Sequence, residues 1–274
     1  MHRPTNTEGS LLMNQVWIDY EHLVTLVEEH PYPLLFVTVC GPHQVGFGPV
    51  ESQLELRGVH AVPYDQITAD GSYEEIFHKS YFYRRGRVSL VTRDVATFNR
   101  MLLGGDSESL EYLYSPLVVR TSSVHYIFKA AGKEYLSPKH VRDIHHRAQF
   151  WLNCLGEESA KPSDAFLHAY RILLMGLHLL QTRRIETDLV KLAKEMQLHD
   201  VEQLAKQNRY VSKPLRLNAT ERRLHARELK RLAAELESMA AATVLVQPPT
   251  EKCVFDQMLT FSRFYLASEQ HKRS

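Results

Sequence analysis

The chain has 274 residues, and 33 lysines and arginines against 32 aspartates and glutamates give it a formal net charge of +1 at pH 7. This balance excludes a protein that binds nucleic acid over its whole surface, so any contact with nucleic-acid phosphates is expected to be local. Hydrophobic residues at 44% exclude wholesale disorder, and the length suits two modest domains. Three distant cysteines exclude a disulfide framework and are typical of a reducing compartment: Cys40, Cys154 and Cys253.

The chain is expected to begin with a flexible lead over residues 1–17, followed by an amphipathic helix over residues 19–30. Residues 34–40 form a continuous apolar run of β-formers, which is typical of a strand buried on both faces. The glycines and proline of residues 46–49 predict a tight turn after this strand.

Further strands and helices are predicted to alternate up to residue 136. Leu54 and Leu56 alternate with polar neighbours, which predicts a second strand. Residues 88–92 predict another strand, and Asp94 is placed to cap a helix over residues 95–103. The sequence therefore predicts an α/β domain over residues 18–136.

The second half carries apolar residues at helical spacing and no strand pattern. It predicts an all-helical domain over residues 137–274. The helices are expected at residues 139–154, 163–182, 186–196, 220–242 and, after two prolines, 251–268.

The apolar runs are too short to span a membrane, and the first ten residues lack the apolar core of a signal peptide. We therefore expect a cytoplasmic protein with no membrane partner.

One motif stands out. Residues 40–60 read Cys-Gly-Pro-His-Gln-Val-Gly-Phe-Gly-Pro-Val-Glu-Ser-Gln-Leu-Glu-Leu-Arg-Gly-Val-His. This stretch resembles the signature of the RNA-repair-associated nucleotidyltransferases, the RlaP-like branch of the DNA polymerase beta superfamily. That signature reads Gly-Ser-His-x-Tyr-Gly-Phe, a short spacer, and Asp-Ser-Asp-Val-Asp-Leu-Arg-Gly-Val-His. Three further segments resemble the family in the same order, at residues 88–94, 110–119 and 168–180.

The resemblance spans residues 33–196 and implies a fold. It implies an α/β (α+β) nucleotidyltransferase domain with a mixed sheet, followed by a helical domain that closes the cleft. It also implies a chemistry, because the family's reaction is an in-line attack on the α-phosphate of a nucleoside triphosphate. Two divalent ions clamp the reacting oxygens in such reactions, and carboxylates hold the ions.

The residues that the chemistry requires are largely replaced in this chain. Carried over position by position, the family's three metal-ligating aspartates fall on Gln53, Glu55 and Ser89. Glu55 is the only retained carboxylate, so the formal charge of the site drops from −3 in the family to −1. Pro42 replaces the serine that holds the triphosphate, which removes a hydroxyl and a backbone donor.

These replacements predict a retired active site, with Glu55 as the one catalytic candidate and no metal ligand assigned. Glu51 and Glu55 are an alternative metal pair, which we favour less because Glu51 is expected to lie in the turn. Neither a metal nor another cofactor is expected. Nucleotide binding, where it survives, is expected to use Gly41, Pro42, His43, Arg57 and Arg171. Arg57 and Arg171 are equally well interpreted as anchors between the two domains.

Two other patterns in the sequence favour structural roles. Histidines on the expected helices lack the i, i+4 spacing of a zinc pair, so polar contacts are favoured; they are His140, His145, His146, His168 and His178. Residues 81–87 interleave aromatic and basic side chains, as single-stranded nucleic-acid sites do. An ordinary hairpin leading into the strand at residues 88–92 is the favoured interpretation.

Three functional hypotheses follow. The favoured one is a catalytically inactive nucleotidyltransferase homologue that acts as a nucleotide- or RNA-binding or regulatory subunit, in contact with a protein partner or a second copy. The first alternative is an active transferase that uses Mg²⁺ or Mn²⁺ with an altered carboxylate set around Glu55. The second alternative is an interaction scaffold without nucleotide binding.

Overall fold

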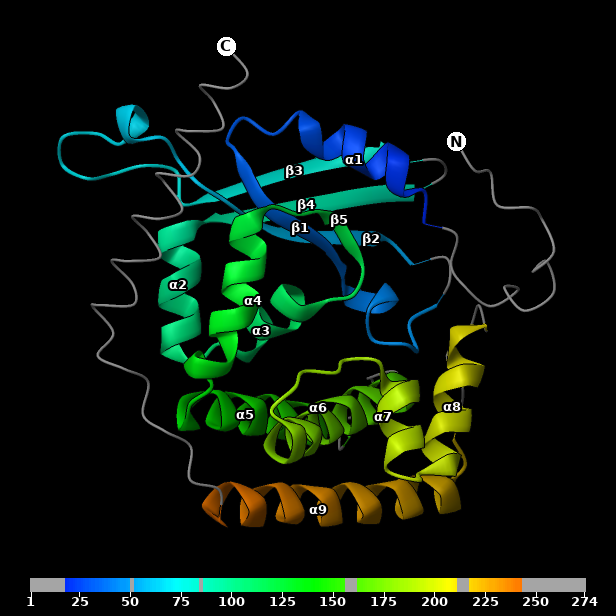
Figure 1. The fold of residues 1–274 in the computed structure, drawn as a ribbon. Coiled ribbons are helices and arrows are strands. Elements are labelled where there is room, and N and C mark those ends of the chain that lie inside the picture. Colours follow the sequence, from blue (N-terminus) through cyan, green and yellow to red (C-terminus); the bar gives the residue numbers. More distant parts are fainter. Residues whose placement is uncertain (1–17, 50–51, 84–85, 156–161, 211–216, 243–274) are drawn as a thin grey trace, which may run out of the picture.

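The computed structural model describes residues 18–49, 52–83, 86–155, 162–210 and 217–242. Its first half is a mixed five-stranded sheet in the order β3-β4-β2-β1-β5 (Figure 1). β2 runs parallel to β4, whereas the other neighbouring pairs are antiparallel. The strands are β1 (Leu34–Cys40), β2 (Leu54–His60), β3 (Ile76–Tyr83), β4 (Gly86–Asp94) and β5 (Val118–Arg120).

Alternation along the strands divides the sheet into two faces. Val37, Leu56 and Leu90 belong to a core that packs under α1 (Tyr20–Glu28). Phe36 and Val59 point to the opposite face and belong to the main core of the molecule. Helices cover part of this second face: α2 (Val95–Gly104), α3 (Ser107–Tyr114) and α4 (Ser123–Tyr135).

The local predictions for this half are confirmed. The buried strand at residues 34–40 and the cap at Asp94, whose carboxylate accepts from the Ala96 N–H at 2.9 Å, are both present. The aromatic and basic segment begins at the end of β3 and continues into β4, as the hairpin interpretation predicted. The expected lead over residues 1–17 and the residue Glu51 lie outside the described residues.

The second half is helical, as predicted (Figure 1). Its helices are α5 (Pro138–Cys154), α6 (Pro162–Thr182), α7 (Leu189–Glu195), α8 (His199–Arg209) and α9 (Ala219–Ala242). Two corrections arise here. The helix expected over 186–196 begins only at Leu189 because the Asp188 carboxylate caps it, and α8 was not predicted. The helix expected over residues 251–268 lies outside the described residues.

One hydrophobic core joins the two halves. Phe36 of β1 and Phe98 of α2 belong to the same cluster of buried residues as Leu173 of α6 and Leu232 of α9. The domain division at residues 136 and 137 remains a prediction, since this core continues across it. Within the described ranges, no helix is both long and apolar enough to cross a bilayer.

A candidate nucleotide cleft

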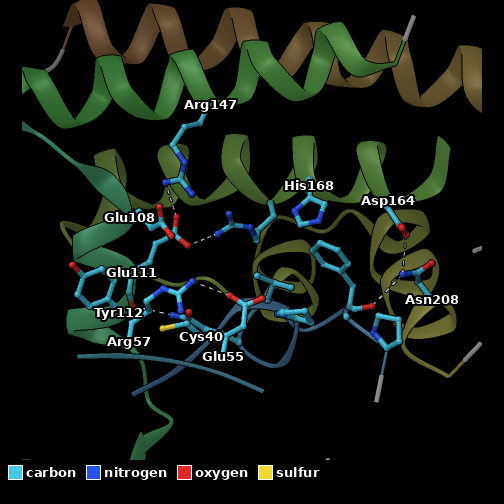
Figure 2. Close-up of a pocket in the computed structure, with 18 residues that line it drawn as sticks. Cys40, Glu55, Arg57, Glu108, Glu111, Tyr112, Arg147, Asp164, His168 and Asn208 are labelled. Carbon is cyan, nitrogen blue, oxygen red and sulfur yellow. Dashed lines mark hydrogen bonds and ion pairs between the residues drawn. The ribbon is translucent and has the colours of Figure 1, made fainter. Parts of the chain in front are cut away.

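A cleft of about 390 Å³ lies between the second face of the sheet and the helical half (Figure 2). The end of β1, the turn after it and β2 form one wall, and α3, α5, α6 and α8 supply side chains opposite. This cleft therefore lies where the sequence resemblance expected a nucleotide.

The turn after β1 is shaped by a glycine. Gly41 has φ +64°, in the left-handed region that glycine adopts readily, and it opens a short 3₁₀ turn, Gly41–His43. A Cβ atom on Gly41 would lie 2.8 Å from Cδ of Glu55, so the Glu55 carboxylate would have to move to admit it. The backbone at Gly41 therefore lies directly against the only carboxylate retained from the family's metal site.

Glu55 is joined in the cleft by a neighbouring cation. Glu55 and Arg57 lie two residues apart on β2, so their side chains share one face. The Arg57 Nη2 donates to the Glu55 Oε2 at 3.1 Å, and Arg57 also donates to the Leu56 carbonyl at 3.2 Å. The Glu55 carboxylate is therefore paired with a guanidinium of the same strand.

The other two expected metal positions do not line the cleft. Ser89 is the register partner of Glu55 across β2 and β4, so the sheet brings these two positions side by side as the resemblance requires. The Ser89 hydroxyl, however, lies 3.4 Å from Nε2 of His78. Gln53 precedes β2, is exposed and is absent from the cleft wall. Of the three positions expected to hold metal, only position 55 carries a carboxylate, and Arg57 pairs it, so these three residues do not fit the family's metal pair.

The expected nucleotide-binding residues divide into two groups. Gly41, Pro42, Arg57 and Arg171 all line the cleft. His43 does not line it, because its Nε2 lies 2.9 Å from the Ser52 carbonyl oxygen, behind the turn. Burial lowers the pKa of His43, which keeps the ring neutral at that position.

Arg171 is held by a buried carboxylate. The Arg171 Nη1 donates to the Glu111 Oε2 at 2.6 Å, and the Glu111 Oε1 lies 2.7 Å from Nη1 of Arg147. Burial alone would raise the pKa of Glu111, but the guanidinium groups of Arg171 and Arg147 together lower it. The three side chains come from α3, α5 and α6, so this ion triad ties the sheet half to the helical half.

Sequence reasoning assigned no role to Glu111 or Arg147. Glu111 lies in the motif of residues 110–119, which was used only as a mark of resemblance. Arg147 lies on α5 without any local pattern that distinguishes it. Arg171 was interpreted either as a nucleotide-binding residue or as an anchor between the two halves. Its ion pair with Glu111 favours the anchor.

The end of the cleft formed by Phe47, His168 and Asn208 is polar and aromatic. The His168 ring stacks on Trp151, with ring centroids 4.2 Å apart and planes at 10°, and it meets Phe47 edge-on at 4.9 Å. Asn208, which is 3% exposed, donates from Nδ2 to the Phe47 carbonyl at 3.2 Å. The loop after β1 is thus joined to α8 at this end of the cleft.

Replacing His168 with phenylalanine is expected to flatten the pH dependence of stability. Burial lowers the pKa of His168 to about 3, whereas the unfolded ring takes up a proton near pH 6.5. The folded state therefore loses stability as the pH falls below 6.5, and this continues down to about pH 3. The variant keeps the stacked ring without the proton site, so between pH 7 and pH 5 it should lose about 2 kcal/mol less than the unchanged protein. Urea unfolding at both pH values measures this, and equal losses would contradict it.

No group of three or more histidine, cysteine, aspartate or glutamate side chains is placed to hold a metal ion in the part of the chain that the structure describes. The histidines considered as zinc ligands make other contacts: His145 pairs with Glu237 at 2.8 Å, and His178 lies 3.5 Å from Glu195.

A family model agrees with the resemblance seen in the sequence. Residues 18–259 match the family described as RlaP, the RNA repair pathway DNA polymerase beta family. A solved nucleotidyltransferase-like protein from Exiguobacterium sibiricum 255-15 aligns with 14% identity, 91% of this chain and 86% of that chain, and a TM-score of 0.32. No curated protein matches the sequence. Because the family match covers most of the chain, this protein belongs to the RlaP family and has its nucleotidyltransferase-like fold.

Proposed function

We propose that this protein is a pseudoenzyme of its family: it binds a nucleotide or RNA in the cleft as a regulatory subunit in cytoplasmic RNA repair, and it does not transfer nucleotidyl groups. One observation carries the proposal. Glu55, the single carboxylate left at the three metal-ligating positions, is ion-paired with Arg57 at 3.1 Å. A lone carboxylate that is already neutralised gives a divalent ion little to bind.

The same pair gives the cleft a means of holding phosphate without a metal. Arginine matches the geometry of phosphate oxygens, and such charge-assisted hydrogen bonds are short and strong. The side chain of Arg57 is 22% exposed in the cleft, whereas Arg171 is buried with Glu111. Of the two arginines expected to bind the nucleotide, Arg57 is therefore the better able to exchange its carboxylate for a phosphate.

Calorimetry with a nucleoside triphosphate tests this proposal. We expect weak binding, with a dissociation constant that EDTA leaves unchanged and that Arg57→Ala raises. Lys230→Ala on the exposed side of α9 is the matched control and should bind as the unchanged protein does. Affinity that vanishes on chelation would support the altered active site instead. If neither nucleotides nor RNA shift the melting temperature, the interaction scaffold would replace the proposal.

A further inference from the structure

A strip of exposed residues extends along the sheet outward from the cleft. β3 is the edge strand, and the residues of β3 that point to the cleft side are all exposed: Ile76, His78, Ser80 and Phe82. The residues between them point the other way, toward α1, and Tyr81 is buried there. We call the exposed cleft-side face of β3 and β4 the outer strip.

The outer strip is continuous with the cleft wall. Glu55 of β2 is the register partner of Ser89, and Ser89 is the register partner of Ser80. Register partners share a face, and neighbouring strands are about 4.8 Å apart. An extended ligand that leaves the cleft at Glu55 would therefore reach Ser80 on the edge strand after crossing two strand spacings. In the strand order, β3 and β4 lie at the end of the sheet opposite β5.

An aromatic ring and a cation stand together on this strip. Phe82 is 85% exposed, and the Arg87 guanidinium lies 5.9 Å from the centroid of its ring. Phe82 and Arg87 are register partners, one two-residue step from Ser80 and Ser89. Exposure of the apolar Phe82 ring to water is unfavourable, and the flat face of the ring is suited to stacking against a base.

The charges of the strip are of one sign. The arginines of the two strands, Arg87 and Arg93, lie on the cleft side, and no aspartate or glutamate of these strands does. Asp94, the one carboxylate of the two strands, is buried on the other face. This local excess contrasts with a formal charge of +1 for the whole chain, so the strip suits a polyanion whose units also have flat faces.

We propose that the outer strip binds a single-stranded nucleic acid, with a base stacked on Phe82 and a phosphate paired with Arg87. Stacking together with phosphate attraction holds single strands without regard to sequence. A duplex hides its base faces, so it would lose the stacking contact. This site is separate from the nucleotide cleft and does not require that the cleft be filled.

Fluorescence anisotropy with labelled RNA and DNA single strands of about ten nucleotides tests the proposal, because sites of this kind span 4–16 nucleotides. The full chain is used, at low and at moderate salt. Phe82→Ala should weaken binding at least about fivefold. Arg87→Glu should weaken it about tenfold or more at low salt and reduce the salt slope by about one. The RNA and DNA arms show whether the sugar contributes to binding.

Matched controls separate this site from general effects. Phe150→Ala removes a phenylalanine that is 61% exposed on α5, and Arg222→Glu reverses an exposed charge on α9; both should bind as the unchanged protein does. Phe82→Ala should also leave mononucleotide binding in the cleft unchanged, so failure of one site is distinguishable from failure of the other.

Three results would overturn the proposal. The first is an unchanged protein that binds no single strand, and the second is duplex bound as tightly as a single strand of the same sequence. The third is a protein dimer, seen by sedimentation, that Phe82→Ala dissociates while single-strand binding stays the same, because the strip would then be a contact between copies.

Discussion

Replacing Glu111 with alanine is expected to lower the free energy of unfolding by about 3–5 kcal/mol, the usual result of leaving a buried charge without its partner. Glu111 is 6% exposed, and Arg171, which it holds at 2.6 Å, is 5% exposed. The loss would leave Arg171 without its ion-pair partner, and its Nε already has no hydrogen-bond partner among the described residues. Urea unfolding followed by circular dichroism measures the change.

The control for this variant lies on the same helix. Glu108 lines the same cleft but is exposed, so Glu108→Ala should change stability by no more than about 0.5 kcal/mol. A triple variant, Glu111→Leu with Arg147→Met and Arg171→Met, should recover much of the loss, because apolar residues of similar volume replace buried ionic groups well. Equal effects of Glu111→Ala and Glu108→Ala would show that the triad contributes nothing.

The sign of the pH effect supplies a second check on Glu111. Its pKa is lowered in the folded state, so its contribution is complete above the ordinary glutamate pKa of 4.5 and is lost as the pH falls below that value. Glu111→Ala should therefore differ most from the unchanged protein near neutral pH and less in acid. This distinguishes a lost ion pair from a simple loss of packing, which would persist at every pH.

Local patterns predicted the elements whose causes are local. The strand at 34–40 is a run of β-formers, and the helix after Asp94 begins at a side-chain cap, so both are visible in a short window of sequence. The helix α8 was missed because it buries few apolar side chains, among them Val201 and Leu204, in a polar segment. Its position depends on contacts with distant parts of the chain, including the bond from Asn208 to Phe47.

The candidate site was predictable in one part only. The motif of residues 40–60 placed Gly41, Pro42, Glu55 and Arg57 together, because a strand, a turn and a strand bring them to one wall. The opposite wall depends on how α3, α5 and α6 pack, and no spacing along the chain encodes the meeting of Glu111 with Arg147. His43 matched the family motif, yet the 3₁₀ turn directs its ring to the Ser52 carbonyl.

Rebuilding the lost carboxylates is expected to create a Mn²⁺ site that we expect the unchanged protein to lack. The variant carries Gln53→Asp, Glu55→Asp and Ser89→Asp, with Pro42→Ser to return the phosphate-holding hydroxyl. The register of β2 and β4 sets positions 55 and 89 side by side, so two new aspartates would face one ion. Aspartate at position 55 also shortens the side chain that Arg57 now pairs with, which frees the carboxylate for the ion. Mn²⁺ binding, followed by calorimetry or electron paramagnetic resonance, should appear only in the rebuilt protein.

A matched control moves one carboxylate by a single strand. Ser80→Asp in place of Ser89→Asp keeps the charge and the face but places the third carboxylate on β3, about 4.8 Å farther from Glu55. It should not restore Mn²⁺ binding, because ligand distances to such ions are set within tenths of an ångström. Equal binding by both variants would mean that charge alone recruits the ion.

The unchanged protein is expected to show no metal-dependent labelling of RNA, protein or small acceptors with any α-labelled nucleoside triphosphate. Removing one preorganised electrostatic group from an active site commonly costs about 10²–10³ in rate, and here two of three carboxylates and the phosphate-holding serine are replaced. Such losses are not additive, since groups that act as a unit fail together when the first is removed. If the unchanged protein shows labelling and Glu55→Ala abolishes it, Glu55 would be a working metal ligand. Arg57 would then pair with Glu55 only while the active site holds no metal.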